Sequence, residues 1–197
     1  GTLYDTFRRS DGTFDYAAIE EINRTSEYGS ALIAARSNNS HDWYGLLSTY
    51  TTKIGQYLDF YGGIDYRFYK GVHRNEISDL FGGTYYLDSE RGNVDVKNNI
   101  HAADPNWRYQ KLGVGDVVFR DYDGFVMQEG GFFQLEYNKD RLAAFVAGSL
   151  SNTGYWRYDR FYYDKEHAKS KTVNFLGFTA KGGANYNICL LYTSPSP

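Results

Sequence analysis

The chain has 197 residues, enough for one ordinary domain, and a formal net charge of −3 with acidic and basic residues mixed along it. That charge gives no support for a nucleic-acid partner. The mean hydropathy is −0.58 and no window approaches 18 consecutive apolar residues, which excludes a membrane-spanning helix. Aromatic residues make up 18% of the chain, with 20 tyrosines. Such a composition suits either a boundary between lipid and water or a Tyr-rich soluble β-domain.

Residues 1–42 have no regular period and form a loop region in this interpretation. Asp15 is placed to cap a short helix over residues 16–23, whose apolar positions fall on one side. The segment 37–42 is rich in Ser and Asn, and it predicts a loop.

From Trp43 onward the apolar residues recur at every second position, which is the period of a β-strand. The pattern is clearest in residues 57–70, where the even positions are apolar and the odd positions include Asp59, Asp65 and Arg67. The sequence predicts five such strands, at 43–54, 57–70, 125–137, 141–157 and 172–188.

The connections alternate between long and short, which is typical of up-and-down outer-membrane barrels. The long ones are 1–42, 71–123 and 158–171, and the short ones are 55–56 and 138–140. The expected fold is therefore all-β: an antiparallel up-and-down meander that is part of a transmembrane β-barrel with long extracellular loops. Five strands are too few to close a barrel, and an open sheet in lipid leaves unpaired edges, so we expect further chain on both sides.

Several strand and turn segments carry a family resemblance. Residues 43–188 resemble the middle of the barrel domain of TonB-dependent outer-membrane receptors, over roughly three quarters of the chain. The segments that carry the resemblance are Asn39-Ser-His-Asp-Trp-Tyr-Gly45, Gly62-Gly-Ile-Asp-Tyr-Arg-Phe-Tyr-Lys-Gly71, Gly115-Asp116 with Asp123-Gly-Phe125, Gly131-Phe-Phe-Gln-Leu-Glu-Tyr137, Ala144-Phe-Val-Ala-Gly-Ser-Leu-Ser151 and Lys181-Gly-Gly-Ala-Asn-Tyr-Asn-Ile188.

The resemblance implies a 22-stranded barrel in the outer membrane of a Gram-negative bacterium, surrounded by lipid and occluded by an N-terminal plug. In the family, the plug carries the motif gripped by the energy-transducing TonB protein, and that plug is missing from these residues. The implied function is active uptake of a nutrient: an iron chelate, cobalamin, a glycan or a peptide. The resemblance implies neither an enzyme activity nor a cofactor.

Aromatic residues supply the candidate sites. Those near predicted strand ends would form a membrane-interface girdle: Tyr44, Tyr66, Phe68, Tyr69 and Trp156. Those in the long loop 71–123 would contact a small nutrient ligand: Tyr85, Tyr86, Trp107 and Tyr109, with Arg108 for an anionic group. For the loop aromatics, the alternative is a small core within the loop.

The polar residues predict no catalytic or metal site. The four histidines fall in predicted loops, and none stands three to five residues from another His or from Cys, as zinc sites require: His41, His73, His101 and His167. The carboxylates Asp88 and Glu90 are interpreted as solvated loop charges. Residues 189–197 resemble a translated sequencing-adapter read-through, so we expect them to contribute nothing to the fold.

Two other functions stay open. One is a secreted carbohydrate-binding β-domain, in which the Tyr and Trp residues are sugar platforms. The other is a structural outer-membrane barrel without transport. Long strands with alternating long and short connections favour a membrane barrel over the carbohydrate-binding domain.

Overall fold

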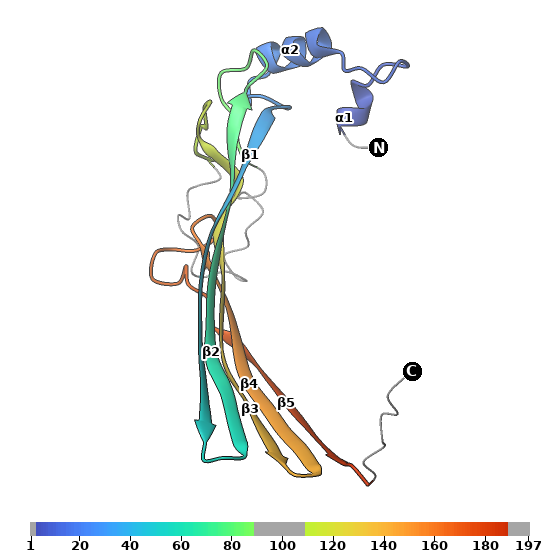
Figure 1. The fold of residues 1–197 in the computed structure, drawn as a ribbon. Helices are drawn as coiled ribbons and strands as arrows, with labels where there is room; N and C mark the ends of the chain where they lie inside the picture. Colours follow the sequence, from blue (N-terminus) through green and yellow to red (C-terminus); the bar gives the residue numbers. More distant parts are fainter. Residues whose placement is uncertain (1–2, 89–108, 189–197) are drawn as a thin grey trace, which may run out of the picture. The chain divides into compact units, whose positions relative to one another are not determined.

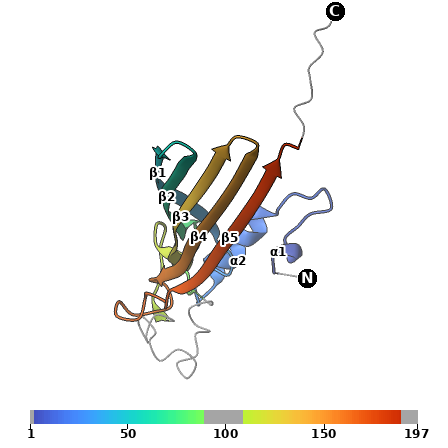
Figure 2. The same cartoon turned by 60° about the horizontal axis from the view of Figure 1, so that its bottom comes forward.

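The structure, a computed structural model, describes residues 3–88 and 109–188. Its five strands form one antiparallel sheet in sequence order, as Figures 1 and 2 show. The predicted all-β antiparallel meander is thus confirmed, and the five strands do not close into a barrel. Within the described residues, no helix is both long and apolar enough to cross a membrane. The elements are α1 (Leu3–Thr6), α2 (Tyr16–Thr25), β1 (Ala34–Ile54), β2 (Leu58–Asp79), β3 (Val117–Lys139), β4 (Leu142–Asp159) and β5 (Val173–Tyr186).

The chain divides into two compact units. The first unit holds Gly1–Asp42, Lys70–Phe125 and Trp156–Lys171. The second unit holds Trp43–Tyr69, Val126–Tyr155 and Thr172–Pro197.

Helix α2 forms where the sequence predicts it and ends two residues later, at Thr25. The Asp15 carboxylate accepts a hydrogen bond from the backbone N–H of Ala18 at 3.2 Å, which satisfies one of the free donors of the first turn. Ile19, only 3% exposed, packs with Phe7 and Leu32 in a small core of the first unit. The predicted helix is therefore confirmed, whereas Ile22, predicted on the same apolar side as Ile19, is 43% exposed.

The strands extend beyond their predicted ends in the first unit. β1 begins at Ala34, so the predicted loop over residues 37–42 is wrong. β2 runs to Asp79 and β3 begins at Val117, so the predicted loop 71–123 is too long at both ends. Turn-favouring side chains are accommodated here because they find cross-strand partners: Asn38 Nδ2 donates to Glu76 Oε2 at 3.0 Å.

The second unit presents two chemically different faces. In the register of β4 with β5, Leu150 lies opposite Phe178, and the adjacent Ser149 lies opposite Thr179. Because successive side chains of a strand point to opposite faces, the first pair lies on one face of the sheet and the second pair on the other. The hydroxyls of Ser149 and Thr179 lie 2.7 Å apart. Leu150 is 62% exposed and Phe178 is 82% exposed, so no other part of the described chain covers their face.

Glycines in the second unit make room for aromatic rings from the neighbouring strand. A Cβ placed on Gly63 in β2 would lie 2.8 Å from the Phe132 ring of β3 and in steric conflict with the Ser48 carbonyl of β1. An aromatic side chain that covers a cross-strand glycine helps to fix the register of a sheet. The close approach of β1, β2 and β3 at this point therefore requires a residue without a side chain at position 63.

We expect Gly63→Ala to destabilise the folded sheet by about 1–3 kcal/mol, because the new methyl group must displace backbone as well as the ring. The measurement is urea unfolding in detergent micelles, followed by circular dichroism. Gly131→Ala is the matched control, since its nearest neighbour would be the Gly63 carbonyl at 3.7 Å. Equal losses in both variants would show that glycine flexibility, rather than the close approach, sets the effect.

Candidate functional site

The loop aromatics predicted to contact a ligand are only partly within the described structure. Trp107 and Arg108 lie outside the described residues. Tyr109 is 70% exposed. Tyr85 is half-buried; its hydroxyl donates to the Glu27 carbonyl at 3.0 Å.

Tyr86 belongs to the packing of the first unit. Its backbone N–H and carbonyl both bond to Leu112, and its ring meets Phe119 edge-on at 6.1 Å. It packs against the buried cluster of Ile33, Ile77, Leu112 and Val118. This placement matches the alternative of a small core more closely than that of a ligand platform.

The predicted membrane-interface residues occur in both units. In the second unit, Tyr44 of β1 stacks on Phe68 of β2 with ring centroids 6.3 Å apart. Tyr66 lies on the same face of β2 as Phe68, whereas Tyr69 is an odd position and projects from the opposite face. In the first unit, Trp156 stacks in parallel on Phe125 at 5.2 Å.

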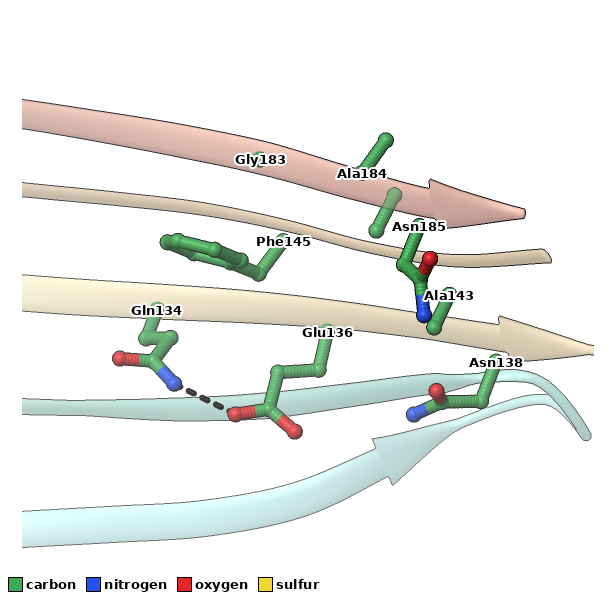
Figure 3. Close-up of a pocket in the computed structure, with 9 residues that line it drawn as sticks. Gln134, Glu136, Asn138, Ala143, Phe145, Gly183, Ala184 and Asn185 are labelled. Atoms are coloured by element: carbon green, nitrogen blue, oxygen red, sulfur yellow. Dashed lines mark hydrogen bonds between the residues drawn. The ribbon is translucent and has the colours of Figure 1, made fainter. Parts of the chain in front are cut away.

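The polar face of the second unit is hollowed near the β3–β4 turn. Figure 3 shows the hollow, where the Gln134 amide donates to the Glu136 carboxylate. Its volume is about 650 Å³, and it is open rather than enclosed. The residues that line it are Gln134, Glu136, Asn138, Ala143, Ala144, Phe145, Gly183, Ala184 and Asn185.

A polar array crosses three strands of the first unit in two rows. In the first row, Arg120 of β3 donates through Nε to Asn75 Oδ1 at 3.1 Å and through Nη2 to Ser37 Oγ at 2.7 Å. In the second row, His73 Nδ1 lies 3.0 Å from Asn39 Oδ1, and the His73 ring lies 4.9 Å from the Tyr122 ring. We call these six residues the strand array: Ser37, Asn39, His73, Asn75, Arg120 and Tyr122.

The strand array was missed at the sequence level because its residues were assigned to loops. The prediction that all four histidines lie in loops is wrong for two of them, since His41 lies in β1 and His73 lies in β2. His101 lies outside the described residues, and His167 does lie in a loop, after β4. The available signal was the matched two-residue spacing of polar residues in neighbouring segments: 37 and 39, 73 and 75, 120 and 122.

An ion-pair cluster ties the loop after β4 to β3 in the first unit. Arg160 Nη2 lies 2.8 Å from Asp123 Oδ1 and 3.0 Å from Asp121 Oδ1. Lys70 Nζ adds a contact of 3.6 Å to Asp123, whose side chain is only 8% exposed. Hydrogen bonding from Arg160, followed by the charges of Arg160 and Lys70, outweighs burial and lowers the pKa of Asp123 below its ordinary value.

The remaining polar residues give no metal or catalytic centre in the described structure. No group of three or more His, Cys, Asp or Glu side chains in residues 3–88 and 109–188 could hold a metal ion. The interpretation of Asp88 as a solvated charge is wrong: it is 2% exposed and accepts a hydrogen bond from the Phe119 N–H at 2.9 Å. Phe119 has a φ of 67°, so Asp88 holds a backbone turn that few non-glycine residues adopt. Glu90 lies outside the described residues.

The fold is an antiparallel meander of five long strands, and the apolar face of its second unit is uncovered. Comparison with protein-family models, with curated proteins and with solved structures gives no match to the chain. The resemblance to TonB-dependent receptors accordingly stays a prediction from strand and turn patterns.

Proposed function

We propose that the chain is part of an outer-membrane receptor barrel for active uptake of a nutrient. The observation that carries the proposal is the uncovered apolar face of the second unit. Its exposed members come from all five strands, and each is more than one third exposed: Leu46, Tyr50, Ile54, Ile64, Phe133, Val146, Leu150, Leu176 and Phe178. A water-soluble protein rarely leaves so many large apolar side chains on one face, whereas lipid covers them in a membrane barrel.

Strand length supports the same proposal. The five strands contain 21, 22, 23, 18 and 14 residues. About 9–11 residues cross the hydrocarbon core, so each strand is long enough to span it and extend further. Soluble sandwiches have a strand length of about 5–6 residues.

The polar face of the second unit would then line the barrel interior. Lys53 and Asp59 form an ion pair at 3.5 Å across β1 and β2, and Arg67 pairs with Asp65 at 3.0 Å. Charged residues on an inward face favour a wide barrel that holds water or a polar plug, because small barrels pack their interiors with side chains. A plug contacted by TonB is the partner proposed for energy transfer, and a small nutrient is the proposed ligand.

The test is contact between the apolar face and detergent. In a background with the native tryptophans replaced by Phe, single tryptophans are placed by Phe178→Trp and Thr179→Trp on adjacent residues of opposite faces. We expect a brominated detergent to quench the fluorescence of Phe178→Trp strongly and that of Thr179→Trp weakly, because bromine quenches on contact.

Two outcomes would contradict the proposal. Equal quenching at both positions would mean that detergent does not distinguish the faces. A sharp monomer peak in gel filtration without detergent would instead favour the secreted carbohydrate-binding domain, because the apolar face would then have to be covered within the monomer.

A further inference from the structure

Arg120 differs from the other strand arginines of the first unit. Three of these contact a carboxylate: Arg36 and Arg74 contact Glu76, and Arg157 contacts Asp159. Arg120 is held by the neutral oxygens of Asn75 and Ser37. In the described structure, no carboxylate contacts it, so its charge is fixed in place but not compensated.

The acidic residues next to Arg120 and next to its partner Asn75 face the other way. Asp121 is its neighbour along β3 and, by the alternation of a strand, projects from the opposite face, where it pairs with Arg160. Glu76 is the neighbour of Asn75 along β2 and likewise pairs on the opposite face with Arg36. The positive charge of Arg120 is therefore available on its own face.

The second row of the strand array adds further polar groups beside Arg120. Tyr122 lies two residues along β3, about 7 Å away on the same face. The amide oxygen of Asn39 lies 3.0 Å from His73 Nδ1 and can only accept, so Nδ1 donates in this contact. The His73 ring packs against the Tyr122 ring with centroids 4.9 Å apart and planes tilted by 32°.

From this arrangement we propose that the strand array binds a small anion with two or more oxygen-bearing acidic groups, such as a polycarboxylate or a polyphosphate. Arg120 Nη1, which has no partner in the described structure, donates to one acidic group. The Tyr122 hydroxyl, one row away, donates to the other, while the His73 ring packs beside Tyr122. Arginine suits this role because its planar fork of N–H groups matches carboxylate and phosphate oxygens.

This inference deepens the proposed function, on which it rests for its biological meaning, by naming the ligand class of the receptor. The strand array belongs to the first unit, whereas the test of the proposed function probes the second. The two can therefore fail separately. Equal detergent quenching of the two tryptophan variants would contradict the proposed membrane barrel. Absence of anion binding would contradict only the proposed ligand class.

The experiment is equilibrium dialysis of the whole 197-residue chain in maltoside micelles against radiolabelled citrate and, separately, pyrophosphate at low salt. We expect saturable binding of at least one of them, with no competition by maltose, a neutral polyol. Competition between the two anions shows whether carboxylate or phosphate is preferred. Absence of saturable binding for both anions would overturn the inference.

Variants locate the site. Arg120→Gln, which keeps donors for Asn75 and Ser37, should weaken the affinity by at least about tenfold, and Arg120→Lys should restore part of it. Tyr122→Phe should weaken it by a few-fold, and it serves as the second probe if Arg120→Gln loses its β-sheet circular dichroism.

Arg36→Gln is the matched control, because Arg36 lies on the opposite face of β1 from Ser37 and pairs with Glu76. It should leave the affinity unchanged within about twofold, as expected for an exposed pair. Equal losses in Arg36→Gln and Arg120→Gln would assign the binding to general positive charge and overturn the proposed site.

Discussion

Replacing Leu150 with arginine should largely abolish stable association of the sheet with lipid. Leu150 is 62% exposed on the apolar face of the second unit, beside Phe178 of β5. Arginine at the midplane of a lipid-facing barrel surface costs about 2–4 kcal/mol, which lowers the inserted fraction by roughly one to three orders of magnitude. The measurement is folding of a complete barrel that contains this chain into lipid vesicles, followed by the heat-modifiable band shift and by protection from trypsin.

The matched control is Ser149→Arg, one residue earlier in the same strand. Ser149 bonds to Thr179 on the polar face, where the proposed barrel interior accommodates a charge. We expect this variant to insert nearly as well as the unchanged chain. The proposal would be refuted by a reversed order, with Ser149→Arg excluded from vesicles and Leu150→Arg inserted.

The sequence was sufficient to predict the meander because its signals are local. The two-residue period marks each strand, and a short turn near Gly55 joins β1 to β2 through a left-handed φ of 69° that glycine adopts without strain. Neighbouring strands joined by such turns must be antiparallel. The helix over Tyr16–Thr25 was likewise predictable, because Asp15 and the spacing of apolar residues act within a few positions.

The strand array and the strand ends of the first unit were not predictable in the same way. Segment 37–42 has the composition of a loop, and only the pairing with residues about 35 positions away makes it a strand. Asp88 shows the same limit: its burial depends on the backbone of Phe119, 31 residues along the chain. Composition reports local preference, whereas these residues are placed by partners distant in sequence.

Replacing Arg160 with alanine should release the loop after β4 from β3 in the first unit. The change leaves Asp121 and Asp123, with side chains only 14% and 8% exposed, without their main cation. Because the Arg160 side chain is itself 38% exposed, its removal should cost about 1–3 kcal/mol, less than for a fully buried pair. The backbone N–H of residue 160 donates to the Asp121 carbonyl at 3.0 Å and reports the opening directly. We expect its hydrogen exchange to become roughly tenfold to a hundredfold faster.

Arg36→Ala provides the comparison, because Arg36 is 69% exposed and its pair with Glu76 should contribute no more than about 1 kcal/mol. Acid should bring the two variants closer together. Arg160 lowers the folded-state pKa of Asp123, so the stabilisation is present above the unfolded value of about 3.9 and is lost as the pH falls through the folded value. Without Arg160 that pKa rises toward the unfolded value, so this acid-dependent loss of protection at residue 160 should shrink or disappear in Arg160→Ala and persist in Arg36→Ala. If exchange at residue 160 were equally fast in both variants at pH 7, or followed the same acid profile, the loop would be held by its backbone bonds rather than by the ion pairs.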